Sequence, residues 1–361
     1  MNDTTSKSVR IWLYVTCFSI ALLVVFGGFV RLTRSGLSIV EWNVITGVLP
    51  PIGEAAWQAE FAKYQQTPEF QIVNKGMTLD EYKKIYYVEY LHRLIGRLVG
   101  LIYVLPLFYF LIRGTIPWRK SWPYLVIGLG FAFQGALGWY MVASGLVDKP
   151  RVSQYRLAAH LITALGLLAL TFWIALRNHP RVAPPGSRRS SPEMRRMSVG
   201  LLVLLLIQIA YGAFVAGLKA GHVSNTWPLM FGRFVPPGLL SIQEPWYLNL
   251  TATAVTVHFI HRWFAFIVFG YALWMYSRAR KIEAAPAVLK TIQVILWLLG
   301  VQITLGVLVV LFNVAISLAL IHQAMGMTVF LTEIFLLYQV FAHQAATAEK
   351  RATLQEGVVH G

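Results

Sequence analysis

The sequence has little charge and almost no cysteine. Charged residues make up 13% of the 361 residues and hydrophobic residues 57%, whereas a soluble domain carries about 25% charged residues. This composition excludes an ordinary soluble fold and indicates a membrane protein. The single cysteine, Cys17, excludes an internal disulfide and any zinc or iron–sulfur site built from several cysteines.

Acidic residues are also scarce, with 15 Asp and Glu against 31 Lys and Arg and a net charge of +16. In a soluble protein this excess would indicate nucleic-acid binding. Here the bases gather in short segments between apolar runs, as the positive-inside rule describes, so no nucleic-acid partner is expected. The first apolar run, about 11–30, is too long for the core of a signal peptide and is predicted to be a membrane span.

Eight apolar runs are each long enough to cross a bilayer, which takes about 20 residues. They cover roughly 11–30, 86–112, 122–144, 153–177, 197–217, 249–276, 287–311 and 316–341. Basic residues are concentrated between the second and third, fourth and fifth, and sixth and seventh runs. The positive-inside rule then places both termini in the cytoplasm, and the absence of a convincing transit peptide favours a bacterial plasma membrane.

The two halves of the chain resemble each other. Seven residues of the first half recur 185 positions later, namely Gly27, Phe29, Val30, Gly36, Trp42, Gly47 and Pro51. Gln134 and Gly138 recur as Gln302 and Gly306. The expected fold is therefore an all-α integral membrane protein of two tandem four-helix bundles, related by a pseudo-two-fold axis along the membrane normal. We expect the halves to be 1–177 and 197–341, with a cytoplasmic linker at 178–196 and a polar cytoplasmic tail at 342–361.

Four histidines belong to this repeat: His92 matches His261, and His160 matches His322. From the outer side, His92, His160 and His322 lie six or seven residues into their predicted spans, or about 9–11 Å deep, and His261 lies twelve residues into its span, or about 18 Å deep. For a single histidine, a hydrogen bond within the core explains such a position equally well. Two histidines in each bundle instead predict axial ligation of a heme iron.

The halves differ at one position beside these ligands. Glu89 precedes His92 by three residues, and its counterpart is His258. A carboxylate beside a heme can accept protons or stabilise positive charge on a substrate carbon, so the first half is predicted to be a chemical site and the second to hold a permanent cofactor. The alternative for Glu89 is an ion pair with Arg93 or Arg97.

Several basic side chains are candidate contacts for heme propionates. Arg93 and Arg262 follow the histidines directly, and others lie near the outer surface, where snorkelling or solvation explains any single one equally well. These others are Arg31, Arg34, Lys149, Arg151 and Arg156. The sequence assigns no role to His222 or His258.

The chain resembles the heme A synthase family along nearly its whole length. The motifs are Glu89-x-x-His92-Arg93, the stretch Asp148 to His160, His258-x-x-His261-Arg262 and His322-Gln323. Some family members carry a cysteine pair in an outer loop, which this chain lacks, so it is similar to the cysteine-free branch of proteobacteria and mitochondria.

The resemblance implies an oxidoreductase that converts the C8 methyl group of heme O to a formyl group by successive hydroxylations and loss of water. The product, heme A, serves cytochrome c oxidase. It also implies His92 and His160 as ligands of the substrate heme, Glu89 as the catalytic carboxylate, and His261 and His322 as ligands of a heme b cofactor.

Two other functions fit four histidines: a diheme b-type electron-transfer cytochrome, and a heme transporter or chaperone. The cytochrome does not explain the long outer loop and the unduplicated Glu89, and a transporter would need alternating access and no oxidation. Expected partners are the farnesyltransferase that forms heme O, cytochrome oxidase assembly factors, an unidentified electron donor or acceptor and a second copy of the chain; the sequence identifies none of them directly.

Overall fold

The computed structural model describes residues 7–43, 46–143, 152–179 and 191–359, with side chains up to Phe341. Eight long helices contain stretches apolar enough to span a membrane. They are α1 (Lys7–Leu32), α4 (Leu79–Ile112), α5 (Trp122–Ala143), α6 (Gln154–Arg177), α7 (Pro192–Gly217), α9 (Ala254–Lys281), α10 (Pro286–Leu311) and α11 (Ile316–Val359). Within the described ranges the only β-type pairing is an isolated bridge between Met230 and Arg233. The predicted all-α fold with eight spans is confirmed.

Several helices extend beyond the predicted apolar runs, because polar caps rather than hydrophobicity decide where they begin. A capping box of Thr78 and Glu81 starts α4 seven residues before the predicted 86. Ser191 caps α7, so 192–196 of the predicted linker are helical; residues 180–190 of that linker lie outside the described part. The helix of the last span, predicted to end at 341, continues to Val359.

The sixth predicted span, 249–276, is two helices. Thr253 has an extended backbone (φ −104°, ψ 120°) and separates α8 (Asn249–Ala252) from α9. The Asn249 side chain donates to the carbonyls of Gln243 and Trp246 and accepts from the Thr253 hydroxyl. These bonds hold the preceding loop and explain why the membrane helix starts later than the apolar run.

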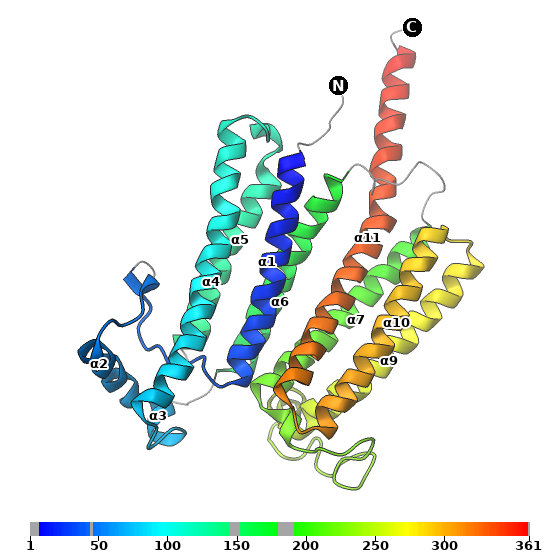
Figure 1. Ribbon diagram of the computed structural model, residues 1–361. Helices are drawn as coiled ribbons and strands as arrows, with labels where there is room; N and C mark the ends of the chain where they lie inside the picture. Colours follow the sequence, from blue (N-terminus) through cyan, green and yellow to red (C-terminus); the bar gives the residue numbers. More distant parts are fainter. Residues whose placement is uncertain (1–6, 44–45, 144–151, 180–190, 360–361) are drawn as a thin grey trace.

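The long helices pack in two groups of four (Figure 1). In the first bundle, α1 and α5 both contact α4 and α6; in the second bundle, α7 and α10 both contact α9 and α11. The bundles meet where α6 packs against α7 and α11, and where α1 packs against α11. Each bundle has its own buried core, and α11 contributes to both. This order of contacts is what two tandem four-helix bundles would give, while the two-fold axis stays a prediction.

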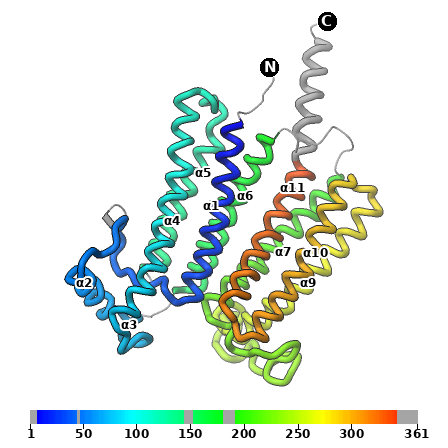
Figure 2. The backbone as a smooth tube through the Cα atoms, in the orientation of Figure 1, coloured from blue at the N-terminus to red at the C-terminus, as the bar shows by residue number. Residues whose placement is uncertain are grey.

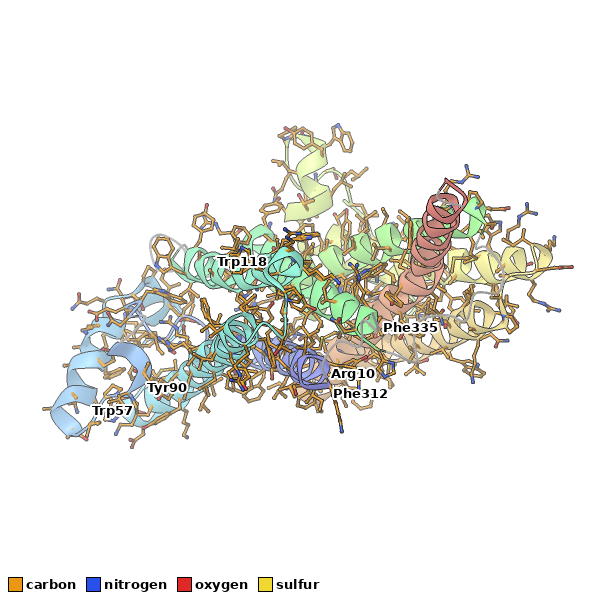
Figure 3. The ribbon with its side chains drawn as sticks, turned by 90° about the horizontal axis from the view of Figure 1, so that it is seen from above. Arg10, Trp57, Tyr90, Trp118, Phe312 and Phe335 are labelled. Carbon is orange, nitrogen blue, oxygen red and sulfur yellow. The ribbon has the colours of Figure 1, made fainter. Side chains whose placement is uncertain are left out.

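The start of α1 lies at one end of the bundles, and the two long loops lie at the other (Figure 2). The first loop contains α2 (Glu54–Gln65) and α3 (Pro68–Ile72). Viewed from above, this loop, marked by Trp57, stands beside α4, marked by Tyr90 (Figure 3). An aromatic cluster including Trp57, Phe61, Tyr64 and Tyr82 packs the loop onto the start of α4. The loop is therefore held against the helix that carries Glu89 and His92.

The two bundles approach each other tightly at Gly217, the last residue of α7. A Cβ atom on Gly217 would lie 2.7 Å from the backbone Cα of Gln154, at the start of α6. Beside this contact, the Arg31 side chain of α1 donates to the carbonyls of Ala216 and Gly217 at 2.8 and 3.1 Å. Only glycine permits this approach.

We expect Gly217→Ala to destabilise the protein by about 1–3 kcal/mol, as overpacking does in a close-packed core. Its thermal unfolding in detergent, followed by tryptophan fluorescence, would then occur at lower temperature. Gly166→Ala in α6 is the matched control, since no described atom lies within 4 Å of a Cβ placed there. Equal melting temperatures for the two variants would contradict the close contact.

Candidate functional site

All four repeated histidines lie against a glycine of the neighbouring helix. A Cβ atom placed on the glycine would lie 3.1–3.2 Å from the imidazole in every case. The pairs are Gly27 with His92, Gly138 with His160, Gly212 with His261, and Gly306 with His322. All four glycines also belong to the sequence repeat. The glycines therefore make room for the imidazoles, and any other side chain would press on the ring.

The second bundle places His261 and His322 face to edge, with ring centroids 6.4 Å apart and ring planes at 84°. Two imidazoles that bind one metal ion have centroids about 6 Å apart, because each ligating nitrogen lies about 2 Å from the ion and each ring centre about 1 Å further. The Nδ1 atoms of both rings are buried and have no hydrogen-bond partner in the described part of the chain. This pair fits axial ligation of one iron.

No group of three or more His, Cys, Asp or Glu side chains in the described ranges could hold a bare metal ion. Two imidazoles suffice only where a macrocycle supplies the other ligands, as in heme. In the first bundle, His92 and His160 are near enough for their charges to interact, and Phe26 stacks on His92 at 6.2 Å. The donor set of both bundles therefore fits heme better than an isolated ion.

Glutamines approach the same histidines. Gln134 donates to the His160 carbonyl at 3.0 Å and lies 3.2 Å from both ring nitrogens. Gln302 lies 3.4 Å from Nε2 of His322, and Gln208 donates to the His261 carbonyl at 3.0 Å. The repeat marked Gln134 and Gln302 in the sequence, but not their place beside the rings.

Glu89 is buried, with 3% of its surface exposed, and donors surround both of its oxygens. Oε2 accepts from the Ser38 amide (2.7 Å), the Ser38 hydroxyl (2.8 Å) and the Ile39 amide (3.0 Å). Oε1 accepts from Nε (3.1 Å) and Nη2 (2.6 Å) of Arg93. The alternative prediction of an ion pair with Arg93 is confirmed, whereas Arg97 donates to the Asn43 carbonyl. Glu89 is thus fixed one turn from His92.

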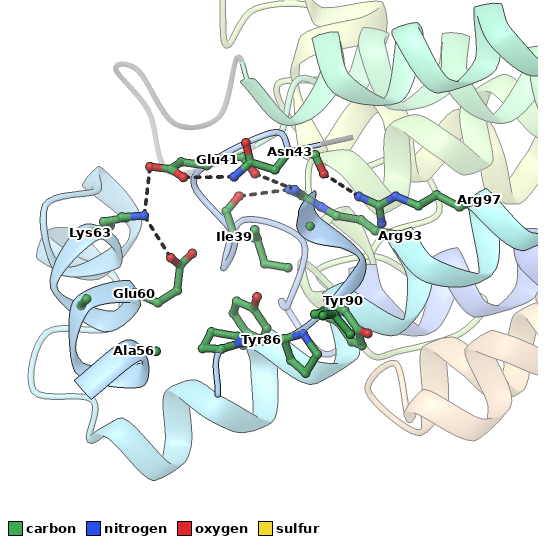
Figure 4. A pocket seen from close by; sticks show the side chains of 15 residues that line it. Ile39, Glu41, Asn43, Ala56, Glu60, Lys63, Tyr86, Tyr90, Arg93 and Arg97 are labelled. Carbon is green, nitrogen blue, oxygen red and sulfur yellow. Dashed lines mark hydrogen bonds and ion pairs between the residues drawn. The ribbon is translucent and has the colours of Figure 1, made fainter. Parts of the chain in front are cut away.

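Arg93 also secures the loop that follows α1 (Figure 4). It donates to the carbonyls of Ile39 (3.0 Å) and Glu41 (3.1 Å), and its guanidinium lies 4.8 Å from the Trp42 ring centre. These contacts fasten the loop to α4.

The second bundle repeats these contacts. Arg262 donates to the carbonyls of Ser224 and Thr226 at 2.9 Å each and lies 5.9 Å from the Trp227 ring centre. Its partners lie 185 positions after those of Arg93. We call these contacts the Arg93 and Arg262 latches. They give both arginines a structural role, and the predicted propionate contacts stay predictions.

His258 takes the place of Glu89 in the second bundle. Its Nε2 accepts from Nε of Arg262 at 3.0 Å, and the side chain is buried. Ser38 is replaced there by Val223, which has no hydroxyl. The two latches therefore have the same frame, but only the first contains a carboxylate.

The remaining bases and histidine have local partners. Arg156 stacks on the Tyr140 ring at 4.1 Å, Arg31 binds the end of α7, and Nδ1 of His222 lies 3.3 Å from Oδ1 of Asn313. Lys149 and Arg151 lie outside the described residues.

A cavity of about 390 Å³ opens between the first loop and α4 (Figure 4). Arg93, Arg97 and Lys63 line it together with Glu41 and Glu60. Lys63 pairs with both carboxylates, at 3.0 and 3.3 Å, and its hydrogen bond lowers the pKa of Glu41. Arg93 of the latch lines this cavity, which the sequence did not predict.

Three further polar residues with buried contacts or buried positions were not predicted from the sequence. Ser38 and Glu69 lie in the first loop, where no periodic pattern marks a contact with a distant helix. Glu333 lies inside the last predicted span, and an acid in that position was a usable signal.

Fold and site together define a class: a multi-pass membrane protein with two helical bundles, each enclosing a pair of histidines in glycine-lined contacts. The comparison with known families agrees with this class. The chain belongs to the COX15-CtaA family, described as cytochrome oxidase assembly protein, whose model matches residues 10–334.

Its relatives include proteins named heme A synthase. The one from Rhodopseudomonas palustris (strain BisB5) is 41% identical over 351 residues, covering 95% of this chain and 94% of the relative. The one from Agrobacterium fabrum is 44% identical over 328 residues, covering 90% and 88%. The one from Flavobacterium psychrophilum is 39% identical over 340 residues, covering 92% and 98%. The predicted family is confirmed.

Glu69 of α3 gives the first loop a pH-dependent stability. Burial, and after it the charge of Glu89, raises the pKa of this carboxyl from 4.5 to about 7, against the opposing effect of Lys219, Arg31 and Arg34. The folded protein thus binds this proton more tightly than the unfolded chain. Its contribution to stability is present below about pH 4.5 and is lost as the pH rises through about 7.

We expect Glu69→Gln to flatten this part of the stability profile. The difference between the melting temperatures at about pH 5 and about pH 8 should be smaller than in the wild type. Glu54→Gln, at an exposed site of the same loop, should keep the wild-type difference. An unchanged profile in Glu69→Gln would show that Glu69 does not titrate in this range.

Proposed function

We propose that this protein is a heme A synthase, an oxidoreductase that converts the C8 methyl group of heme O to a formyl group and so provides heme A for cytochrome c oxidase. The observation that carries the proposal is the carboxylate of Glu89 beside one of two duplicated histidine pairs. The chain also aligns over most of its length with relatives that are named heme A synthase. The route consists of successive hydroxylations followed by loss of water.

His261 and His322 would hold the heme b cofactor. Their spacing of 6.4 Å and their buried, unpartnered Nδ1 atoms support this assignment. When bound, this cofactor supplies one-electron transfer. Gln208 and Gln302 keep the backbone and ring of the two histidines in place, and Gly212 and Gly306 leave the room that the rings need.

His92 and His160 would bind the substrate heme O, with Glu89 as the catalytic carboxylate. Ser38 and Ile39 hold Oε2 of Glu89 from the loop side, and Arg93 holds Oε1 from the same helix. A carboxylate fixed in this way can accept a proton released from the substrate or stabilise positive charge on the carbon that is oxidised.

A diheme electron-transfer cytochrome is the second candidate function, since it would use the same four histidines. The contrast between the latches favours the synthase. An electron carrier needs no carboxylate at either pair, and the second bundle builds the same latch with His258. The first bundle nevertheless has Glu89 together with three donors from the loop.

The setting we propose is a bacterial plasma membrane, with both termini in the cytoplasm and the histidine pairs toward the outer side. The basic segments after α4, α6 and α9 support this orientation. The farnesyltransferase that makes heme O is the proposed supplier of the substrate, and oxidase assembly factors, an electron donor or acceptor and a second copy of the chain are further candidate partners.

Glu89→Ala should abolish conversion of heme O. We expect the purified wild type, expressed with a supply of heme O, to contain heme A or its hydroxylated precursor, and the variant to accumulate heme O. Loss of a general base typically lowers the rate by about 10²–10⁴-fold. Pigment extraction and chromatography measure both, with Asp80→Asn, an 88% exposed side chain of the same helix, as control. Two hemes b per chain in all three proteins would establish the electron-transfer cytochrome instead.

Gly306→Val should remove heme b from the second bundle, because the added side chain would displace the His322 ring, which lies 3.1 Å from the Cβ position. Heme b content per chain, measured as the pyridine complex, is expected to fall strongly. Gly300→Val tests the same change in the same helix, where no described atom lies within 4 Å of a Cβ. Full heme b content in Gly306→Val would exclude His322 as a ligand.

A further inference from the structure

Glu333 is an acid within the membrane-spanning part of α11 for which the proposed reaction has no use. Its side chain is 0% exposed, and neither carboxylate oxygen has a hydrogen-bond partner among the residues that the structure describes. A carboxylate anion in such surroundings would be unpaired and poorly solvated, a cost that disappears when the group carries a proton. Acids at this depth in a membrane usually serve a function.

The surroundings of Glu333 are apolar. Val329, Leu336 and Val340 share its face of α11 and belong to the core of the second bundle. The buried side chains of the neighbouring parts of α7 and α10 carry no titratable group. They are Met194, Met197, Ser198, Leu201, Leu205, Val288, Thr291, Ile292, Ile295 and Leu299.

The other elements also carry titratable side chains. Tyr271 of α9 is near enough to be influenced by the charge of Glu333, and its hydroxyl donates to the Met197 carbonyl at 3.1 Å. On the opposite side of α11, α1 contributes Cys17 to the core of the first bundle, and the exposed Arg177 of α6 is near enough to act on Tyr338. Neither oxygen of Glu333 has a bonding partner among the described residues, so the acid depends on its own proton for neutrality.

The position of Glu333 connects it with the histidine pair. It follows His322 by eleven residues, which is three helical turns, so the two side chains share a face of α11 about 16 Å apart along the axis. It lies on the side of His322 that points toward the end of the span near the chain termini (Figure 1).

The repeat shows that the fold does not require an acid here. The counterpart of Glu333, with the same offset of 162 as His160 and His322, is Thr171. The Thr171 hydroxyl is buried and donates to the Leu167 carbonyl at 2.7 Å. A self-satisfied threonine is thus sufficient for packing in the first bundle, and the carboxyl of the second bundle needs another explanation.

We propose that Glu333 is a proton-binding site inside the membrane, whose proton compensates charge at the His261–His322 pair. Glu333 would bind one proton from solvent at the near end of α11 if a heme held by this pair took up an electron, so that the added negative charge is compensated. When the electron leaves, the O–H bond breaks and the proton returns. This coupling rests on the proposed function, under which oxidation of the substrate supplies the electrons. The presence of a protonated acid at Glu333 is independent of that function.

Infrared spectroscopy of the full-length protein tests both parts. At a pH well above 7, where the Glu69 carboxyl is ionised, the heme-free wild type should show the carbonyl-stretch band of a protonated carboxylic acid, shifted in D₂O and absent from Glu333→Gln. In the heme-loaded protein, this band should grow on reduction with dithionite and be lost from the reduced-minus-oxidised spectrum of Glu333→Gln. Glu193→Gln is the control, since Glu193 is paired with Arg278 on the surface, and it should keep the band.

The outcomes are separable. A heme-free wild type without this band, or a band that persists in Glu333→Gln, would disprove the proton site whatever the protein catalyses. A band that does not respond to reduction would disprove the coupling. A chain that binds no heme would refute the proposed function and leave the first measurement valid. If Glu333→Gln does not fold, Glu333→Thr replaces it, because threonine occupies the equivalent position in the first bundle.

Discussion

The contact between each of four histidines and a glycine on the next helix is the constraint on which the molecule depends. It sets how closely consecutive helices approach, and it places the imidazoles of each bundle in the space between those helices. In the second bundle the result is a ring spacing of 6.4 Å, close to the spacing that a shared metal requires. A larger residue at any of the four glycines would separate the helices and the rings together, so ligation and packing cannot vary independently.

Because the frame is duplicated, each bundle serves as an internal control for the other. Arg93 and Arg262 fasten equivalent loops through equivalent carbonyls, which identifies the latch as part of the fold. The differences are then informative. The first bundle adds Glu89 and Ser38 where the second has His258 and Val223, and the second adds Glu333 where the first has Thr171. Each bundle therefore has a carboxyl group that packing does not need. Hydrogen-bond donors surround Glu89, whereas no donor to Glu333 is found among the described residues.

Much of this could be predicted from the sequence, because apolar length and the repeat leave strong patterns. The eight spans, the four histidines and the contrast between Glu89 and His258 are all visible there. Helix boundaries were less accessible, since α4 begins at the capping box of Thr78 and α9 begins after the extended backbone of Thr253, and neither feature is visible in hydrophobicity. The latches were not predictable, because Arg93 and Arg262 bind backbone carbonyls, which any residue at 39, 41, 224 or 226 provides. The same bases therefore suggested propionate contacts, which a sequence pattern cannot separate from bonds to the chain itself.

The geometry of Glu89 places a condition on any chemistry at the first pair. Within the described part of the chain, its hydrogen bonds come from two sources, the Ser38–Ile39 segment and Arg93. The same arginine fastens that loop at Ile39 and Glu41, so a change at Oε1 of Glu89 is passed directly to the loop. If Glu89 accepts a proton, its attraction for Arg93 weakens, and the remaining bonds to the two carbonyls must hold the arginine in place. In the second bundle Arg262 has the Nε2 acceptor of His258 in place of a carboxylate, and its bonds to the two carbonyls persist. The bonds between the arginine and the loop therefore do not require a carboxylate, since the second bundle forms them without one.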